Sequence, residues 1–478
     1  MTDEQGSGRG ILHTGRNSQM QVKELQSRIE GNLTNRPDPG YETLRRQIIW
    51  NQLTPARYPE LIVQVVSEHD VIEAVRFART YRMKIAVRGG GHSWVGFPLR
   101  DGSLLIDLGR LSQVSIDAKA RIAVVQPAVT GRELNRQLAS HGLAFPVGHC
   151  ATVPLSGFLL SGGLGWNFNR WGPACFSVEA ANVVTADSRL VTANSEQHAD
   201  LFWAIRGGGP GFFGVVTQYR LRLHSAPCAI TTSTYFYPFE RIEELGAWAA
   251  RVARQLSRDV ELTIFCAPAP PDLIARCSSS NGFVAMLSAT AFVDTAGEAA
   301  AALAPLESCP VFNECLHKEV NRPTPMEALL DMSGRAWPER QRYLADTLWS
   351  DSSPARQLAI LRDCFLQAPS KQSLAACVFS TGTESAAAPL PDAAFSMTAR
   401  TLVLFYAIWQ QPEDDGANIA WHRKTIAALD QFALGHYVGE SDILADPARA
   451  ERSFAPANWK RLQSLRGIYD PDGFFSGV

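Results

Sequence analysis

Residues 87–96 read VRGGGHSWVG and place three consecutive glycines directly before a histidine, His92. Because glycines lack a Cβ atom, their backbone N–H groups can converge on an anion such as a pyrophosphate. The spacing matches neither the GxGxxG dinucleotide fingerprint nor the GxxxxGK[ST] phosphate loop. The loop alone is therefore open to two interpretations, an ordinary tight turn or a phosphate cradle. His92 is either a nucleophile or a loop histidine bonded to backbone.

A second glycine-rich stretch lies at residues 148–172, GHCATVPLSGFLLSGGLGWNFNRWG, with Cys150 near its start. Imidazole and thiolate are the nucleophiles that can add to an electrophilic ring. Two glycine-rich loops, each beside one nucleophile, indicate one extended cofactor that is held at several points. The alternative for Cys150 is a small, buried, apolar residue.

The pair RGGGHSxxG and GxCxTVxxSGFxLxGGLGW resembles the berberine-bridge-enzyme-like branch of the vanillyl-alcohol-oxidase flavoprotein superfamily, whose FAD domain is of the PCMH type. Three further stretches, at residues 182–187, 200–224 and 458–475, resemble motifs of the same family in the same order. The resemblance covers most of residues 45–228 and the C-terminal segment, whereas the middle of the chain matches poorly.

The resemblance implies a bicovalent FAD, attached through its 8α-methyl carbon to the ring of His92 and through carbon 6 to the sulfur of Cys150. It also implies further residues around the cofactor: Arg88, Gly89, Gly90, Gly91, Ser93, Thr152, Val153, Ser156, Gly157, Gly162, Gly163, Val184 and Asn458. For Asn458 the alternative is an asparagine that caps a short helix.

The sequence departs from the family pattern at Pro154, where glycine is usual, and at Ser161, which replaces the first glycine of a usual GGG. Neither change removes a residue predicted to hold the flavin. Val153 stands where family oxidases tend to carry valine, whereas a leucine there is associated with poor access of oxygen to the flavin. The resemblance therefore favours an oxidase over a dehydrogenase.

Oxidation of a carbon that bears O–H or N–H requires a group to accept the heteroatom proton. The family carries a Tyr-x-Asn-(Tyr/Phe/Glu)-x-Asp pattern near the C-terminus, and residues 435–442, GHYVGESD, resemble it with Gly439 in the asparagine place. On a strand, Tyr437 and Gly439 would share one face and Glu440 the other. We predict Tyr437 as the proton acceptor, which requires a nearby cation because tyrosine ordinarily has a pKa of about 10. A tyrosine hydrogen-bonded in the core is the alternative.

Hydrophobic periodicity predicts the elements that position these residues. A strand is expected at 401–409, TLVLFYAIW, and a packed core strand is favoured there. The alternative is that Tyr406 lines the substrate face of the second domain's sheet. The other expected strands are at 61–66, 84–88, 104–111, 121–129 and 181–193. The expected helices are at 69–83, 130–142, 295–308 and within 456–475, with Thr130 as an N-cap and Gly142 as a C-cap.

The predicted fold class is α+β. Residues 1–40 are expected to be a polar lead-in, and residues 41–228 a PCMH-type FAD-binding domain of two α+β subdomains. Residues 229–450 are expected to form a substrate-binding domain with an antiparallel sheet covered by helices. Residues 451–478 are expected to return to the FAD domain.

Composition excludes several classes of protein. The net charge of −2 argues against nucleic acid as a partner, and no apolar run reaches the ~18 residues that span a membrane. The polar N-terminus lacks the apolar region of a signal peptide. Nine cysteines without a CxxC pair predict neither a disulfide framework nor a structural zinc site, and the histidines show no metal-ligand spacing. We expect a cytoplasmic monomer or homodimer that meets a small-molecule substrate and O2, and neither nucleic acid, membrane nor metal.

The favoured function is an FAD-dependent oxidase that takes a hydride from an alcohol, sugar, amine or specialised metabolite and reduces O2 to H2O2. The alternatives are a flavin-dependent dehydrogenase, an oxidative cyclase of a biosynthetic pathway, and a non-redox flavoprotein cyclase. Fold knowledge does not choose among them, because function resides in the site.

Overall fold

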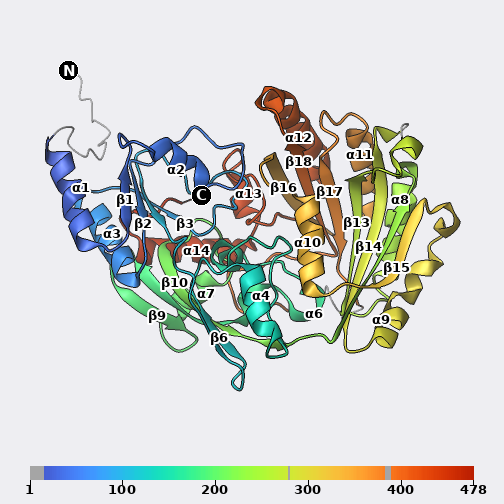
Figure 1. The fold of residues 1–478 in the computed structure, drawn as a ribbon, viewed down its shortest axis with the longest axis horizontal. Coiled ribbons are helices and arrows are strands. Elements are labelled where there is room, and N and C mark those ends of the chain that lie inside the picture. Colours follow the sequence, from blue (N-terminus) through green and yellow to red (C-terminus); the bar gives the residue numbers. More distant parts are fainter. Residues whose placement is uncertain (1–15, 278–279, 383–388, 478) are drawn as a thin grey trace.

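A computed structural model of the chain describes residues 16–277, 280–382 and 389–477. Two smaller sheets lie in one half of the molecule and a seven-stranded sheet lies in the other (Figure 1). This mixture of helices with separate sheets confirms the predicted α+β class.

The first sheet has four strands in the order β1-β2-β4-β3, with β2, β3 and β4 parallel and β1 antiparallel to β2. Its strands are β1 (Asn32–Asn35), β2 (Leu61–Gln64), β3 (Ile85–Arg88) and β4 (Leu104–Asp107), and its helices are α1 (Arg16–Arg28), α2 (Tyr41–Gln47) and α3 (Glu68–Thr80). Buried Val71, Ala74 and Val75 of α3 pack against this sheet, as the periodicity predicts. Within residues 1–40, which were predicted to be a polar lead-in, α1 and β1 form part of this layer. Residues 1–15 lie outside the described residues.

The second sheet is antiparallel, with five strands in the order β5-β6-β10-β8-β9. They are β5 (Val114–Asp117), β6 (Ile122–Val125), β8 (Val178–Thr185), β9 (Leu190–Asn194) and β10 (Gly214–Arg222). The helices here are α4 (Gly131–Ala139), α5 (Leu155–Leu160), α6 (Phe168–Trp171) and α7 (Ala199–Ile205), and a short pair joins β7 (Leu143–Ala144) to β11 (His224–Ser225). Thr130 caps α4 as predicted, since its hydroxyl accepts a hydrogen bond from the Glu133 N–H (3.2 Å).

The third sheet is fully antiparallel, in the order β15-β12-β14-β13-β17-β18-β16. Its strands are β12 (Ala229–Tyr237), β13 (Val260–Pro268), β14 (Phe283–Val293), β15 (His317–Pro323), β16 (Arg342–Ser350), β17 (Leu374–Phe379) and β18 (Thr401–Trp409). The helices of this half are α8 (Ile242–Val252), α9 (Ala296–Leu303), α10 (Met326–Ala336), α11 (Pro354–Phe365) and α12 (Asp415–Leu429).

Side chains alternate between the two faces of this sheet. Along β13, Leu262 and Ile264 join the core under α8, α11 and α12, whereas Thr263 and Phe265 point to the opposite face, toward the other half of the molecule. One face of the sheet is therefore core and the other is a wall of a cavity.

The C-terminal segment returns to the first half, where α14 (Pro456–Tyr469) lies, whereas α13 (Ala448–Glu451) lies between the two halves (Figure 1). Beyond α14, the Ile85 N–H of β3 donates to the Phe474 carbonyl (2.7 Å), and the Ser476 N–H donates to the Ile85 carbonyl (2.9 Å). The tail thus pairs with the strand that leads into the glycine loop. All nine cysteines are described and free, and no described helix is long and apolar enough to cross a membrane.

Candidate active site

A cavity of about 1100 Å³ separates the inner face of the seven-stranded sheet from the loops that follow β3 and β7. Pockets for a single small molecule usually measure roughly 300–1,000 Å³. The cavity therefore has room for a cofactor together with a substrate, and each of the two glycine-rich stretches supplies part of its wall.

The glycine loop packs closely against a neighbouring side chain and a neighbouring backbone carbonyl. A Cβ atom on Gly90 would lie 2.1 Å from Pro154 Cγ, and one on Gly91, whose φ is +75°, would lie 2.0 Å from the Ile48 carbonyl oxygen. Across from this loop, the buried hydroxyl of Ser156 has no hydrogen-bond partner among the described residues. An unpaired hydroxyl beside bare backbone at a cavity wall fits a polar group of a bound cofactor.

The side chains of His92 and Cys150 both contact Thr152. Burial, and less strongly the charge of Arg88, lower the pKa of His92 to about 4, against the effect of a hydrogen bond to the Thr152 backbone. The imidazole is therefore neutral at pH 7 and keeps a nucleophilic ring nitrogen. It stacks against Trp50, with ring centroids 5.3 Å apart. The sulfur of Cys150 lies 3.6 Å from the Thr152 hydroxyl, so both predicted points of attachment lie beside one residue.

The structure divides the predicted site residues into two groups. The cavity wall contains Gly89, Gly90, Gly91, His92, Ser93, Cys150, Val153, Ser156, Gly157 and Tyr437. The remaining predicted residues lie outside the described wall: Arg88, Thr152, Gly162, Gly163, Val184 and Asn458.

Several residues of the second group are occupied by contacts within the protein. The Arg88 guanidinium donates to the Asp107 carboxylate (2.9 Å), and Val184 is buried in the core of the first sheet. The side-chain amide of Asn458 donates to the Ala393 carbonyl (2.8 Å), which ties α14 to a loop. These side chains support the elements around the cavity without entering it.

The stretch 435–442 is not a strand. Gly435 forms an isolated bridge with Trp349 of β16, and residues 438–440 form a turn. Strict alternation of side chains holds only for extended backbone, so the prediction that Tyr437 and Glu440 point in opposite directions is wrong. Both residues line the cavity.

Tyr437 is poorly suited to accept a proton. Its hydroxyl oxygen accepts a hydrogen bond from the Gly163 N–H (3.3 Å), and burial raises its pKa well above the ordinary tyrosine value. The neutral phenol therefore persists at physiological pH. The nearby cation that the sequence argument required is not among the causes that act on this pKa.

A tyrosine–carboxylate pair that the sequence did not predict, Tyr406 and Glu440, lies at the cavity instead. The hydroxyl of Tyr406 donates a short hydrogen bond to the Glu440 carboxylate. The predicted strand 401–409 is β18, but Tyr406 points to the cavity because its neighbours Phe405 and Ala407 point to the core. Burial raises the pKa of Glu440, while the bond from Tyr406 and the charge of His149 oppose that rise. A carboxylate whose pKa is raised is a stronger base.

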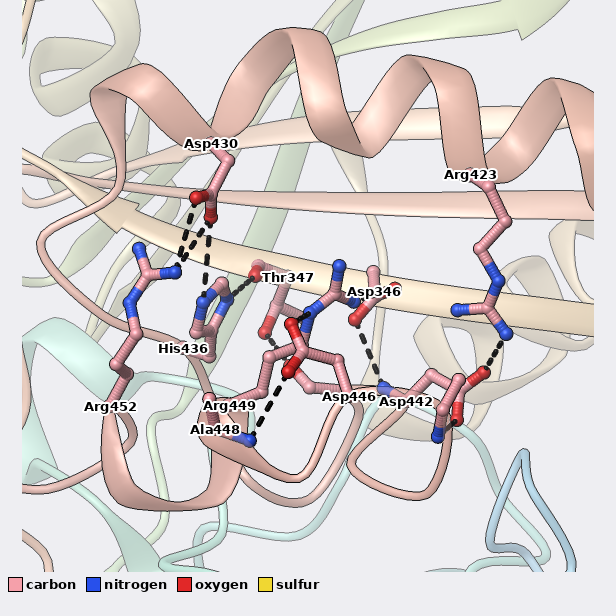
Figure 2. Close-up of polar contacts among 12 residues, drawn as sticks. Asp346, Thr347, Arg423, Asp430, His436, Asp442, Asp446, Ala448, Arg449 and Arg452 are labelled. Atoms are coloured by element: carbon pink, nitrogen blue, oxygen red, sulfur yellow. Dashed lines mark hydrogen bonds and ion pairs between the residues drawn. The ribbon is translucent and has the colours of Figure 1, made fainter.

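Strand β16 holds the 435–442 stretch in place, as Figure 2 shows. The hydroxyl of Thr347 accepts a hydrogen bond from the Tyr437 N–H (2.9 Å), and the Asp346 carboxylate accepts one from the Asp442 N–H (3.0 Å). Asp346 is fully buried and also forms an ion pair with Arg449. The turn that carries Glu440 is thus anchored at both ends to the edge of the sheet.

A second ionisable pair was missed by the sequence argument. His149, next to Cys150 in the chain, has its Nε2 atom 3.7 Å from a carboxylate oxygen of Glu261 on β13 and packs against Trp166 with ring centroids 4.2 Å apart. Glu261 also accepts a hydrogen bond from the Phe168 N–H (3.2 Å). Its position next to Cys150 could have drawn attention to His149, whereas Glu261 gave no sequence signal.

Comparisons with known proteins agree with this geometry. Residues 59–194 match a family described as "FAD binding domain". The FAD-linked oxidoreductase penO of Penicillium crustosum is 28% identical over 437 residues, which cover 91% of this chain and 93% of that protein. A berberine bridge enzyme variant superposes with a TM-score of 0.80 at 20% identity, covering 95% of this chain and 97% of its own. A variant of Phl p 4 gives 0.79 at 20% identity, covering 96% and 98%.

The fold and the cavity define a flavoprotein oxidoreductase, in which an FAD-binding half faces a sheet across one large cavity. The chain is a flavoprotein that is similar to FAD-linked oxidoreductases over most of its length and shares the fold of berberine bridge enzyme. The tight glycine loop, the unpaired Ser156 hydroxyl and the neutral His92 imidazole fit a bound FAD.

Proposed function

We propose that this protein is an FAD-dependent oxidase that oxidises an alcohol or amine carbon, with its flavin attached to both His92 and Cys150. The observation that carries the proposal is the placement of the Tyr406–Glu440 pair in the same cavity as those two nucleophiles. The proton acceptor and the two residues proposed to hold the flavin then line the same cavity. Removal of a hydride and a proton from one substrate requires that flavin and proton acceptor lie close to the same bound molecule.

An FAD held at His92, Cys150 and the glycine loop would supply the hydride acceptor and the route of the electrons to dioxygen, with hydrogen peroxide as the product. Tyr406 and Glu440 accept the proton that the substrate loses. A substrate O–H that reaches Tyr406 transfers its proton to the phenol oxygen as the phenol's own proton moves to Glu440. The transfer leaves a neutral tyrosine and a protonated carboxyl, so the high pKa of Tyr406 is no obstacle.

Oxygen use is supported by a small side chain at the cavity wall. Val153 lines the cavity near Cys150, as the family pattern led us to expect of an oxidase. Wild-type Phl p 4.0202 is a glucose dehydrogenase, whereas an isoleucine-to-valine variant of Phl p 4 is a glucose oxidase. A glycine-to-alanine variant of berberine bridge enzyme is a reticuline dehydrogenase. In this fold a single change of side-chain size accompanies a change in oxygen use.

The test has two parts. Acid-denatured protein should keep its yellow colour and the added mass of FAD. The His92→Ala and Cys150→Ala variants should each keep the flavin through the other residue, and the double variant should release it. Anaerobic mixing with a substrate alcohol should bleach the flavin, and admission of air should restore the colour with release of peroxide. Reoxidation that needs an added electron acceptor would overturn the oxidase assignment.

A further inference from the structure

The cavity is poor in positive charge. Among the described residues of its wall, Arg335 is the single arginine or lysine, and it is exposed near the end of α10. Two carboxylates, Glu261 and Glu440, also line the cavity. An anionic substrate would lose its hydration there, find no buried cation to pair with, and lie in the field of two carboxylates.

The sheet wall is apolar where it faces the reacting pair. Phe265, Ala376 and Leu404 are in register across β13, β17 and β18 and all point into the cavity, and Met286 continues the row on β14. A sugar placed on this row would bury several hydroxyls against carbon atoms that cannot hydrogen-bond them. An apolar ring system would instead gain by leaving water.

Two indoles flank the proton acceptor. Trp94, two residues after His92, and Trp337, at the end of α10, both pack edge-on against Tyr406, with ring centroids 5.5 Å away in each case. These two side chains come from opposite halves of the molecule, and both line the cavity beside Tyr406. Flat aromatic walls beside a reacting group suit a flat ring on the substrate.

We propose, on the basis of the proposed function, that the substrate is an alcohol or amine whose reacting carbon is attached to a flat, apolar ring system without an anionic group. Sugars and carboxylates are excluded. The ring would lie against the Phe265–Leu404 row between the two indoles, and its hydroxyl or amine would meet Tyr406. This inference concerns what the cavity binds, and it is separable from whether the bound molecule is oxidised.

The test measures binding and bleaching separately on the flavin-loaded protein without oxygen. The probes are naphthalen-2-ylmethanol, anthracen-9-ylmethanol, naphthalene-2-carboxylate and glucose, and the readouts are quenching of tryptophan fluorescence and loss of flavin colour. At least one ring alcohol should bind tenfold or more tightly than naphthalene-2-carboxylate, and glucose should show no saturation. Saturable binding of glucose, equal binding of naphthalene-2-carboxylate, or no binding by either ring alcohol would overturn the inference. Binding of a ring alcohol without bleaching would count against the proposed oxidase only.

Substitutions of Trp337 test whether its indole contributes to the binding of ring alcohols. Trp337→Ala should raise the dissociation constant of the ring alcohol at least tenfold with unchanged flavin content, and Trp337→Phe should keep it within about threefold because a ring face remains. Ile468→Ala, at an exposed position on α14, is the matched control and should leave binding as in the wild type. Equal affinity of the Trp337→Ala variant and the wild type would refute the aromatic wall.

Discussion

Glu440→Gln tests the proton acceptor directly. The substitution keeps the size of the side chain and an oxygen that can accept the Tyr406 hydroxyl, but it removes the charge. A positioned general base contributes about 10²–10⁴ in rate, which corresponds to roughly 3–5 kcal/mol of barrier. We expect the anaerobic rate of flavin bleaching to fall within that range while the flavin content is unchanged.

Among the described residues of the cavity wall, no other carboxylate can replace Glu440. Glu261 lies two strands away from Tyr406 and about six residues along β13, a Cα separation on the order of 20 Å at the usual strand spacing and rise. Tyr437 keeps its own proton because burial raises its pKa. Glu440→Gln should therefore remove the whole contribution of the general base to the bleaching rate. Glu261→Gln should leave the pH dependence of that rate unchanged.

The bleaching rate should depend on pH through the ionisation of Glu440. The pKa of Glu440 is raised by burial, so the wild-type bleaching rate should fall as pH drops through a value above the ordinary glutamate pKa, and it should level off at higher pH. Glu440→Gln should lose this acidic limb. The ionised carboxylate also opposes folding at high pH, so the variant should melt at a higher temperature than wild type near pH 8, and this difference should vanish below the unfolded pKa.

Stopped-flow absorbance across pH 5–9 is the assay, with exposed Glu413→Gln as the control for a change of charge. If the variant bleaches within threefold of the wild-type rate and keeps the acidic limb, Glu440 is not the base and the argument from its burial fails.

Two further predictions concern flavin loading and folding. Gly91→Ala should lower the flavin-to-protein ratio, because the new Cβ would lie 2.0 Å from a backbone oxygen. Gly102 has a similar positive φ but open space around it. Gly102→Ala should therefore cost only the ~1–2 kcal/mol of backbone strain and bind flavin normally. Arg449→Met leaves the buried Asp346 carboxylate without its ion pair and should lower the free energy of unfolding by about 3–5 kcal/mol in denaturant titrations, and added Asp346→Asn should recover part of the loss. Normal loading of Gly91→Ala, or a full additive loss in the double variant, would contradict these arguments.

The sequence by itself determined the local structure and the identity of the cofactor. Apolar periodicity located α3 and the strand 401–409, and the hydroxyl of Thr130 marked the start of α4. These features depend on residues close together in the chain, so local spacing reveals them. The motifs of the two glycine-rich stretches carried the resemblance to a flavoprotein family, and glycine is required where the backbone approaches a neighbour as closely as Gly91 approaches the Ile48 carbonyl.

The tertiary structure decided which side chains enter the cavity. The strand that carries Tyr406 is as predicted, but the sequence favoured a packed core position over the alternative that Tyr406 faces the substrate. One face of that sheet is covered by helices, and the other, with Tyr406, is left to the cavity. The direction of Glu440 depends on a turn that Thr347 and Asp346 fasten to β16, about ninety residues earlier in the chain. No local pattern encodes such a contact. Which face of a strand lines the cavity depends on which face is covered by helices. Those helices come from distant parts of the chain.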